Sequence, residues 1–286
     1  MLQRVSTILH SFLLVVLLGS FSSIVYYFKH EPSPMPAATF EPTPVLTPSR
    51  RVEPTPDANW SLIQPGLERR VIDIYNDQNT HVESLYIWRI DQKYFRLDVA
   101  YDEKPKTLGT WQAETDAAIV LNGGYYSIDN ERYFPDGLTI VDGRAVGHTF
   151  NGFGGMLAIS PAGAELRWLV EKPYNPYERL QAGLQSFPIL VNPGGELGFG
   201  AERENHVSAR RTVIAQDKDG RILLMVAPLG YFTLHQFSLY LTESDLNLDL
   251  AINLDGGGST GILVANPHEL ISSDRPIPFV ILVYPR

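Results

Sequence analysis

The sequence contains no cysteine among its 286 residues. Disulfides and thiolate metal sites are therefore excluded, and the fold depends on burial and hydrogen bonding. Basic residues are also few, since 23 Lys and Arg face 32 Asp and Glu, and no basic run is longer than a pair. The resulting net charge of −9 argues against a nucleic-acid partner, because neutralising a phosphate backbone requires a basic surface. The 44% hydrophobic content is typical of a globular protein.

Asp, Glu, Lys and Arg are missing between residues 5 and 28, where only His10 could carry a charge. At about 1.5 Å per residue, this run is long enough to cross a ~30 Å hydrocarbon layer. We therefore expect residues 1–30 to anchor the protein as a single-pass membrane protein, with the remainder outside the cytoplasm. A cleaved signal peptide and a secreted product is the alternative, because small residues between 19 and 23 offer a cleavage site.

Residues 31–58 are rich in proline and threonine, with eight prolines between Glu31 and Asp57. This composition cannot bury enough apolar surface to fold, so a disordered, extended linker is predicted. Residues 59–286 then form the folded domain. Its short apolar runs are separated by Gly, Pro, Asn and Asp, which indicates a β-rich α+β fold.

We predict a single α+β domain with a mixed, largely antiparallel sheet core and few helices. The Asp219-Gly220 turn predicts that the apolar runs on either side of it form a hairpin. Helices are expected over 107–116 and 234–241, the second with a capping box between Thr233 and Gln236. The predicted strands cover residues 82–90, 94–100, 116–122, 137–143, 155–160, 165–170, 187–191, 212–216, 222–227, 250–254 and 279–284.

Three motifs are candidates for chemistry. In LAINLDGGGST an apolar strand ends at Asp255, and three glycines allow a backbone to approach a ligand closely. The segment suits an anion or a sugar, although a simple glycine-rich turn explains it equally well. No GxxxxGK[ST] pattern is present, so the loop is not a nucleotide P-loop.

The other two motifs are LNGGYY at 121–126 and ARRT at 209–212. Asn122 offers an amide and the two tyrosines offer walls for a sugar, while an ordinary turn is the simpler explanation. In an alternating strand, either Arg210 or Arg211 must face the covered side. A buried guanidinium there requires an anionic ligand or an internal salt bridge.

Together these motifs resemble the phosphodiester glycosidase family, whose members carry an NGG-aromatic motif, an RTAIG-like strand and an NLDGGGS loop in this order. The resemblance spans roughly residues 80 to 286. It departs from the family pattern at three places. Ala227-Pro228-Leu229-Gly230 replaces a segment that often carries an Asp-Gly pair, Ala215 replaces a glycine, and Gln236 replaces a glutamate that would matter if it were catalytic.

The resemblance implies a hydrolase that cleaves a sugar-1-phosphodiester at the glycosyl C–O bond in an envelope or extracellular glycan. A catalytically silent carbohydrate- or phosphate-binding module is the alternative, favoured by the missing acid. We expect Asp255 and Arg211 to be catalytic. The expected substrate-binding residues are Asn122, Gly123, Gly124, Tyr125, Tyr126, Arg210, Gly256, Gly257, Gly258, Ser259 and Thr260.

No cofactor is established by the sequence. Asp129, Asp136 and Glu204 lie in loops beside the motifs and are candidates for a second acid or a structural calcium site, although solvated loop charges explain them as well. The histidines at 148, 206 and 235 lack a metal-binding spacing, so no metal role is assigned to them.

Overall fold

The computed structural model describes residues 59–150 and 152–286. The predicted membrane segment at 5–28 and the linker at 31–58 lie outside these residues. Across the described part of the chain, no helix combines the length and apolar character needed to span a bilayer.

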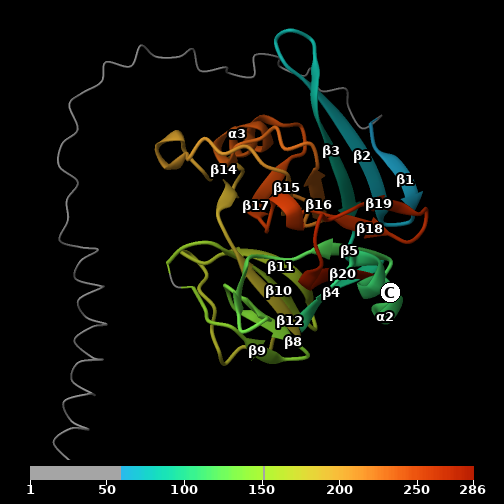
Figure 1. Cartoon of the computed structure of the whole chain (residues 1–286), viewed down its shortest axis with the longest axis vertical. Coiled ribbons are helices and arrows are strands. Elements are labelled where there is room, and N and C mark those ends of the chain that lie inside the picture. Colours follow the sequence, from blue (N-terminus) through green and yellow to red (C-terminus); the bar gives the residue numbers. More distant parts are fainter. Residues whose placement is uncertain (1–58, 151) are drawn as a thin grey trace, which may run out of the picture. The chain divides into compact units, whose positions relative to one another are not determined.

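Strands dominate the domain and form three larger sheets and one hairpin (Figure 1). The eight-stranded sheet contains, in spatial order, β1 (Ser61–Gln64), β2 (Leu67–Tyr75), β3 (His81–Ile90), β16 (Ile222–Ala227), β15 (Arg211–Asp217), β17 (Leu248–Asn253), β13 (Ile189–Asn192) and β14 (Glu196–Leu197). One five-stranded sheet contains β11 (Gly163–Trp168), β10 (Gly155–Ser160), β12 (Ala182–Ser186), β8 (Thr139–Val141) and β9 (Arg144–Val146). The other contains β19 (Glu269–Ile271), β18 (Ile262–Val264), β5 (Ile119–Asn122), β20 (Ile277–Pro285) and β4 (Phe95–Lys106). The hairpin joins β6 (Tyr126–Asp129) to β7 (Arg132–Pro135).

Within the described residues every strand pairing is antiparallel, so the expected mixed sheet is corrected to an antiparallel one. Parallel neighbours need long crossover connections, usually helical, and this domain has few helices. The hairpin predicted at Asp219-Gly220 is confirmed, because β15 and β16 pair from Arg211 opposite Ala227 to Gln216 opposite Ile222.

Both predicted α-helices are present in the described residues, as α2 (Leu108–Thr115) and α3 (Leu234–Glu243). The capping box of α3 is complete: Gln236 N–H donates to the Thr233 hydroxyl at 3.2 Å, and Thr233 N–H donates to the Gln236 side-chain oxygen at 3.1 Å. Phe237 and Leu241 form the buried face of this helix. Two short 3-10 turns complete the helical content, η1 (Ala201–Arg203) and η2 (Gly257–Ser259).

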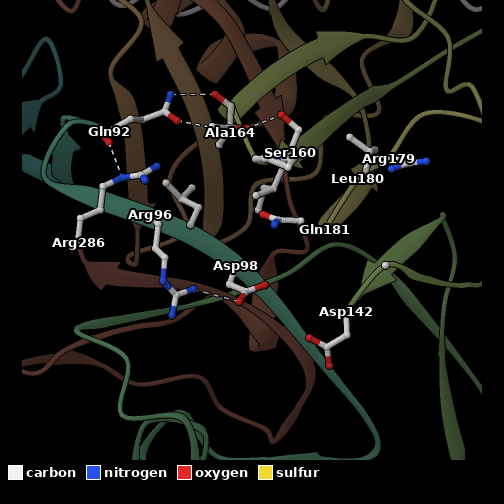
Figure 2. Close-up of a pocket in the computed structure, with 15 residues that line it drawn as sticks. Gln92, Arg96, Asp98, Asp142, Ser160, Ala164, Arg179, Leu180, Gln181 and Arg286 are labelled. Carbon is white, nitrogen blue, oxygen red and sulfur yellow. Dashed lines mark hydrogen bonds and ion pairs between the residues drawn. The ribbon is translucent and has the colours of Figure 1, made fainter.

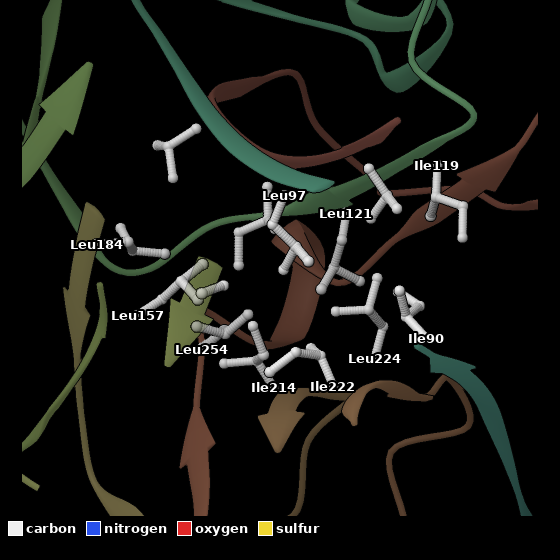
Figure 3. Close-up of a cluster of buried hydrophobic side chains, with 14 of the residues drawn as sticks. Ile90, Leu97, Ile119, Leu121, Leu157, Leu184, Ile214, Ile222, Leu224 and Leu254 are labelled. Carbon is white, nitrogen blue, oxygen red and sulfur yellow. The ribbon is translucent and has the colours of Figure 1, made fainter. Parts of the chain in front are cut away.

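The main hydrophobic core lies where the three larger sheets face one another (Figure 3). Leu121 of β5, Leu157 of β10 and Ile214 of β15 are among its fully or almost fully buried members. Side chains alternate along β15, so Val213 instead joins a second core under α3. The central strands β15, β16 and β17 of the eight-stranded sheet are consequently buried on both faces. The same alternation sends Arg211 toward the second core and Thr212 toward β5.

Candidate active site

Three strand ends meet at Asn122, the last residue of β5. Its side-chain oxygen accepts hydrogen bonds from the Thr212 hydroxyl at 2.8 Å and from Gly261 N–H at 3.0 Å. Its side-chain nitrogen donates to the Asp255 carbonyl at 2.8 Å. The structure therefore brings the NGGYY, ARRT and DGGGST motifs together, although they are widely separated in sequence. Because Asn122 is fully buried and bonded within the protein, the role these contacts give it is to position the three motifs.

The glycines of these motifs allow backbone segments to touch. A Cβ on Gly256 would lie 2.7 Å from the Arg210 carbonyl oxygen, and one on Gly124 would lie 3.1 Å from the Gln185 carbonyl. The ring of Phe279 fills the corresponding space beside Gly123. Gly257 differs, because a Cβ there would face open space, and its φ of +57° lies in the left-handed region that favours glycine.

Asp255 follows β17 and presents a half-buried carboxylate at the base of the loop. One of its oxygens accepts Gly256 N–H at 2.9 Å. Burial raises the pKa of Asp255 above its ordinary value, and the charge of Asp136 raises it further. Hydrogen bonds from Ser259 and Gly256, and the positive charge of Arg275, act in the opposite direction without cancelling the shift. Asp255 is therefore a carboxyl group whose environment resists ionisation, as is common for catalytic acids and bases.

Arg275 is a neighbour of this carboxylate that the sequence did not identify. Its guanidinium packs on Gly258, where an added Cβ would meet Nη2 at 2.7 Å and Nε at 2.8 Å. The side chain is exposed, and no hydrogen bond or ion pair joins its guanidinium to another of the described residues. Arg275 is thus available to a ligand. Arg275 lies in the segment SSDRP, and no motif there predicted that it would contact the glycine loop.

Arg211 is buried, with 7% of its surface exposed, and its charge has no carboxylate partner within the described residues. Its Nε donates to the Phe232 carbonyl at 3.1 Å, and one terminal nitrogen donates to the Val207 carbonyl at 2.8 Å. Burial lowers its pKa, while the nearby Tyr125 and Glu204 act to raise it. Of the two alternatives for a buried guanidinium here, an anionic ligand or an internal salt bridge, the salt bridge is therefore not formed by Arg211 within the described residues.

Arg210 makes the ionic contact instead. It pairs with Asp274 at 2.8 Å and donates from one terminal nitrogen to the carbonyls of Thr260, at 3.1 Å, and Ser272, at 2.7 Å. Its own carbonyl accepts Gly257 N–H at 2.8 Å. Arg210 therefore holds both the glycine loop and the segment that carries Arg275.

Tyr125 and Tyr126 differ in their contacts. The Tyr125 hydroxyl lies 2.6 Å from the side-chain nitrogen of Asn253, at the end of β17, and its ring stacks on Phe187 with centroids 4.7 Å apart. The Tyr126 hydroxyl lies 3.4 Å from Ser259 Oγ, beside Asp255.

Two buried polar atoms of this region, Asn253 Oδ1 and Thr260 Oγ1, have no hydrogen-bond partner among the described residues. Asn253 was not predicted as a site residue. Buried polar groups ordinarily have partners, so the site contains unused hydrogen-bonding capacity.

The segment that replaces the family's Asp-Gly pair is supported by a different acid. The Glu83 carboxylate is completely buried and accepts the N–H groups of Leu229 at 2.9 Å and Tyr231 at 3.2 Å. Gln236, which replaces a family glutamate, serves as the capping-box partner of Thr233. Two of the three departures from the family pattern thus have a structural account.

The remaining loop acids and histidines have other positions. Burial alone would raise the pKa of Glu204, but hydrogen bonds from Thr233 and from backbone N–H groups that include His235 lower it. Glu204 is therefore a helix cap for α3. Asp136 is exposed and hydrogen-bonded to Ser127, and Asp129 is exposed in the β6–β7 hairpin. Within residues 59–150 and 152–286, no group of three His, Asp or Glu could hold a metal ion.

A cavity of about 630 Å³ lies elsewhere, and we call it the lateral cavity (Figure 2). Its charged groups are largely engaged with neighbours: Arg96 pairs with Asp98 at 3.3 Å, and Arg286 donates to the carbonyls of Gln92 and Phe95. None of its lining residues belongs to the three motifs. Its lining is formed by Gln92, Arg96, Leu97, Asp98, Asp142, Gly143, Ile159, Ser160, Pro161, Gly163, Ala164, Arg179, Leu180, Gln181 and Arg286.

Solved structures share this fold. The domain is similar to the catalytic domain of zebrafish N-acetylglucosamine-1-phosphodiester alpha-N-acetylglucosaminidase, auto-inhibited by its pro-peptide, with a TM-score of 0.62 and 20% identity over 78% of this chain and 85% of that one. A hypothetical protein from Synechocystis matches with a TM-score of 0.54 and 13% identity, over 78% of this chain and 63% of that one. A Burkholderia pseudomallei protein matches with a TM-score of 0.51 and 13% identity, over 71% and 74%.

No curated protein matches the sequence significantly. The profile of the phosphodiester glycosidase family, however, matches residues 115–284, a span that contains all three motifs and Arg275. The chain belongs to the phosphodiester glycosidase family.

Proposed function

We propose that this protein is a hydrolase that cleaves a sugar-1-phosphodiester at the glycosyl C–O bond. The observation that carries the proposal is the Asp255 carboxylate, whose pKa is raised by burial and which lies at a glycine loop beside an unpaired Arg275. An acid with a perturbed pKa next to free cationic and backbone donors suits the cleavage of an anionic substrate.

Cleavage of a sugar-1-phosphodiester needs only one catalytic carboxylate. A phosphate ester already leaves readily near neutral pH, so donors that stabilise its charge can replace the proton donor of ordinary glycosidases. In this proposal, the glycine loop, Arg211 and Arg275 bind the phosphate. Asp255 accepts a proton from water or stabilises the positive charge that develops on the sugar.

Asp136 is the candidate for a second carboxylate, because it is exposed and close enough to Asp255 to raise its pKa. Asn122 holds the motifs in place, and the tyrosines flank the sugar. The substrate would be a phosphodiester-linked sugar in an envelope or extracellular glycan. We further propose, from the uncharged run at 5–28 and the proline-rich segment after it, that the domain acts outside the cytoplasm, tethered or secreted.

A silent carbohydrate- or phosphate-binding module is the second candidate. It is favoured by the segment Ala227-Pro228-Leu229-Gly230, which lacks the acid often found there in the family. The same site would bind the same ligand without cleaving it.

Cleavage of a sugar-1-phosphodiester in 18O-labelled water separates these functions. The proposed hydrolase places the label in the released sugar, because the C–O bond breaks. Label in the phosphate would instead identify a phosphodiesterase, and binding without any product would identify the silent module. Mass spectrometry of both products reads out all three results.

A further inference from the structure

The Tyr125 hydroxyl has a proton that the protein does not use. The Asn253 side-chain nitrogen has two hydrogens and three neighbouring acceptors, so one hydrogen is shared; two of these acceptors are the carbonyls of Leu254 at 2.8 Å and Phe187 at 3.3 Å. Carbonyls only accept hydrogen bonds, so they fix which end of the Asn253 amide is the nitrogen. The third neighbour of this nitrogen is the Tyr125 oxygen at 2.6 Å, which must therefore accept.

An accepting phenol keeps its own O–H for another partner. No acceptor for this O–H is found within the described residues, and the Tyr125 ring is only half-buried. The ring is fixed by stacking on Phe187, and the Tyr125 carbonyl accepts Asp136 N–H at 2.9 Å. The O–H is therefore held by rigid neighbours and is free to donate to a ligand.

The hydroxyl also lies within electrostatic range of both expected catalytic groups. Burial raises the pKa of Tyr125 to about 12, and the Asp255 charge contributes to this, while Arg211 and the hydrogen bond from Asn253 oppose it. The phenol consequently stays protonated at neutral pH, so its O–H remains available as a donor while its oxygen accepts from Asn253.

We infer that Tyr125 is a catalytic residue whose O–H donates a hydrogen bond to the departing phosphate oxygen; this inference rests on the proposed function. The C1–O bond breaks, and its electron pair remains on the phosphate oxygen. Water supplies the hydroxyl group to C1, and its proton leaves through Asp255. Tyr125 and Arg211 stabilise the charge that forms on the phosphate.

The Tyr125 proton is not transferred in this step. A phosphate monoester has a second pKa of about 6, so its dianion is a much weaker base than a phenolate. Tyr125 is thus a fixed donor comparable to one member of an oxyanion hole, rather than a general acid.

The test compares Tyr125→Phe with Tyr240→Phe in the full chain. Phenylalanine keeps the ring of Tyr125 and its stacking on Phe187. Tyr240 is a matched control, because burial also raises its pKa to about 12 and it lies in α3, in the second core. Two quantities are measured: kcat/KM on a sugar-1-phosphodiester, and the Kd of methyl phosphate by calorimetry, which needs no turnover.

We expect Tyr125→Phe to lower kcat/KM by about 10²–10³-fold, the effect of removing one oxyanion donor. It should weaken methyl phosphate binding by about tenfold, as expected for one hydrogen bond to a charged group. Tyr240→Phe should leave both values unchanged.

The outcomes separate this inference from the proposed function. If the wild-type protein cleaves nothing but its affinity for methyl phosphate depends on the Tyr125 hydroxyl, the hydrolase proposal fails and the donor role stands. If the wild-type protein cleaves substrate and Tyr125→Phe matches Tyr240→Phe in both measurements, Tyr125 is not the donor and the hydrolase stands. A wild-type protein that does not bind methyl phosphate also overturns the donor role.

Discussion

The glycine-loop site comprises residues 255–260 together with the Asn122, Tyr125, Asn253, Arg210, Arg211 and Arg275 side chains around them. It and the lateral cavity contain similar kinds of residues, but those residues differ in their burial and in their partners. In the lateral cavity the side chains of Arg96 and Asp98 pair with each other while remaining 48% and 37% exposed. In the glycine-loop site Arg211 is buried without a carboxylate partner, and Asn253 Oδ1 is buried without any partner in the described residues. Burying a charge without a counter-charge, or a polar atom without a hydrogen-bond partner, costs free energy, so these groups are candidates for a functional role.

The comparison shows that the lateral cavity and the unpartnered buried atoms near the glycine loop lie in different parts of this domain. The lateral cavity is spacious, but its charges are hydrated or satisfied. Three of the buried polar atoms that lack a hydrogen-bond partner among the described residues lie in the glycine-loop site: Arg210 Nε, Asn253 Oδ1 and Thr260 Oγ1. Variants placed in matched pairs, one in each region, can test whether this difference reflects function.

The largest expected effect is on turnover. Asp255→Asn should lower kcat by about 10²–10⁴-fold, because an amide cannot accept a proton from water. Asp142→Asn in the lateral cavity should leave kcat unchanged, and its left-handed φ of 50° is one that asparagine tolerates. Steady-state kinetics of both variants is the measurement. Full activity of Asp255→Asn would remove Asp255 from the mechanism, and a loss in Asp142→Asn would shift attention to the cavity.

Next in size is the loss of a buried guanidinium. Arg211→Lys cannot reach both the Phe232 and Val207 carbonyls, so we expect the free energy of unfolding to fall by about 1–3 kcal/mol. Arg96→Lys breaks an exposed pair and should cost about 0–1 kcal/mol. Urea denaturation of both variants measures the difference. Equal losses would contradict the contrast drawn between the two regions.

A smaller effect is expected on the pH dependence of activity. Arg275 lowers the pKa of Asp255, so Arg275→Gln should raise that pKa further. Because the reaction requires ionised Asp255, the acidic limb of the kcat/KM profile should move to higher pH. Arg179→Gln, an exposed arginine of the lateral cavity, provides the control. An acidic limb that does not move would show that Asp255 is not the titrating group.

The smallest effect concerns stability. The folded-state pKa of Asp255 lies above its ordinary value of 3.8, so its ionised form destabilises the fold at neutral pH. Asp255→Asn should therefore raise Tm at pH 7, where each kcal/mol corresponds to about 2–4 °C in a domain of this size. The gain should shrink as the pH falls and vanish below the unfolded-state pKa. Calorimetry from pH 7 to pH 3 would contradict this assignment if Tm fell at pH 7 or the gain did not depend on pH.

The sequence was informative where local rules decide the structure. The hairpin at Asp219-Gly220 and both α-helices follow from turn and capping residues, and the apolar runs correspond to core strands such as β16 and β20. It was uninformative where strands lack an apolar run. The strand β12, AGLQS, is fully buried, but Leu184 is its one large apolar residue, so no apolar run marked it.

The site was predicted to the same extent. Glycines that allow close backbone contact leave a recognisable motif, so the convergence at Asn122 could be anticipated. Arg275 and Asn253 could not, because their importance depends on which atoms remain without partners after folding. The division of labour between Arg210 and Arg211 was open for the same reason. Alternation along β15 required one of them to face inward. Only the fold shows which carbonyls and carboxylates each arginine binds.

The buried carboxylate of Glu83 has a consequence for how the site could diversify. Its hydrogen bonds to the segment after β16 come from the N–H groups of Leu229 and Tyr231, which every residue except proline possesses. The Glu83 carboxylate thus fixes the backbone path of this segment, whatever side chains the segment carries. Leu229, 58% exposed, could change freely while the Phe232 carbonyl continues to hold Arg211. Glu83 therefore fixes the backbone of this segment, so that its side chains can vary without changing the Phe232 carbonyl that binds Arg211.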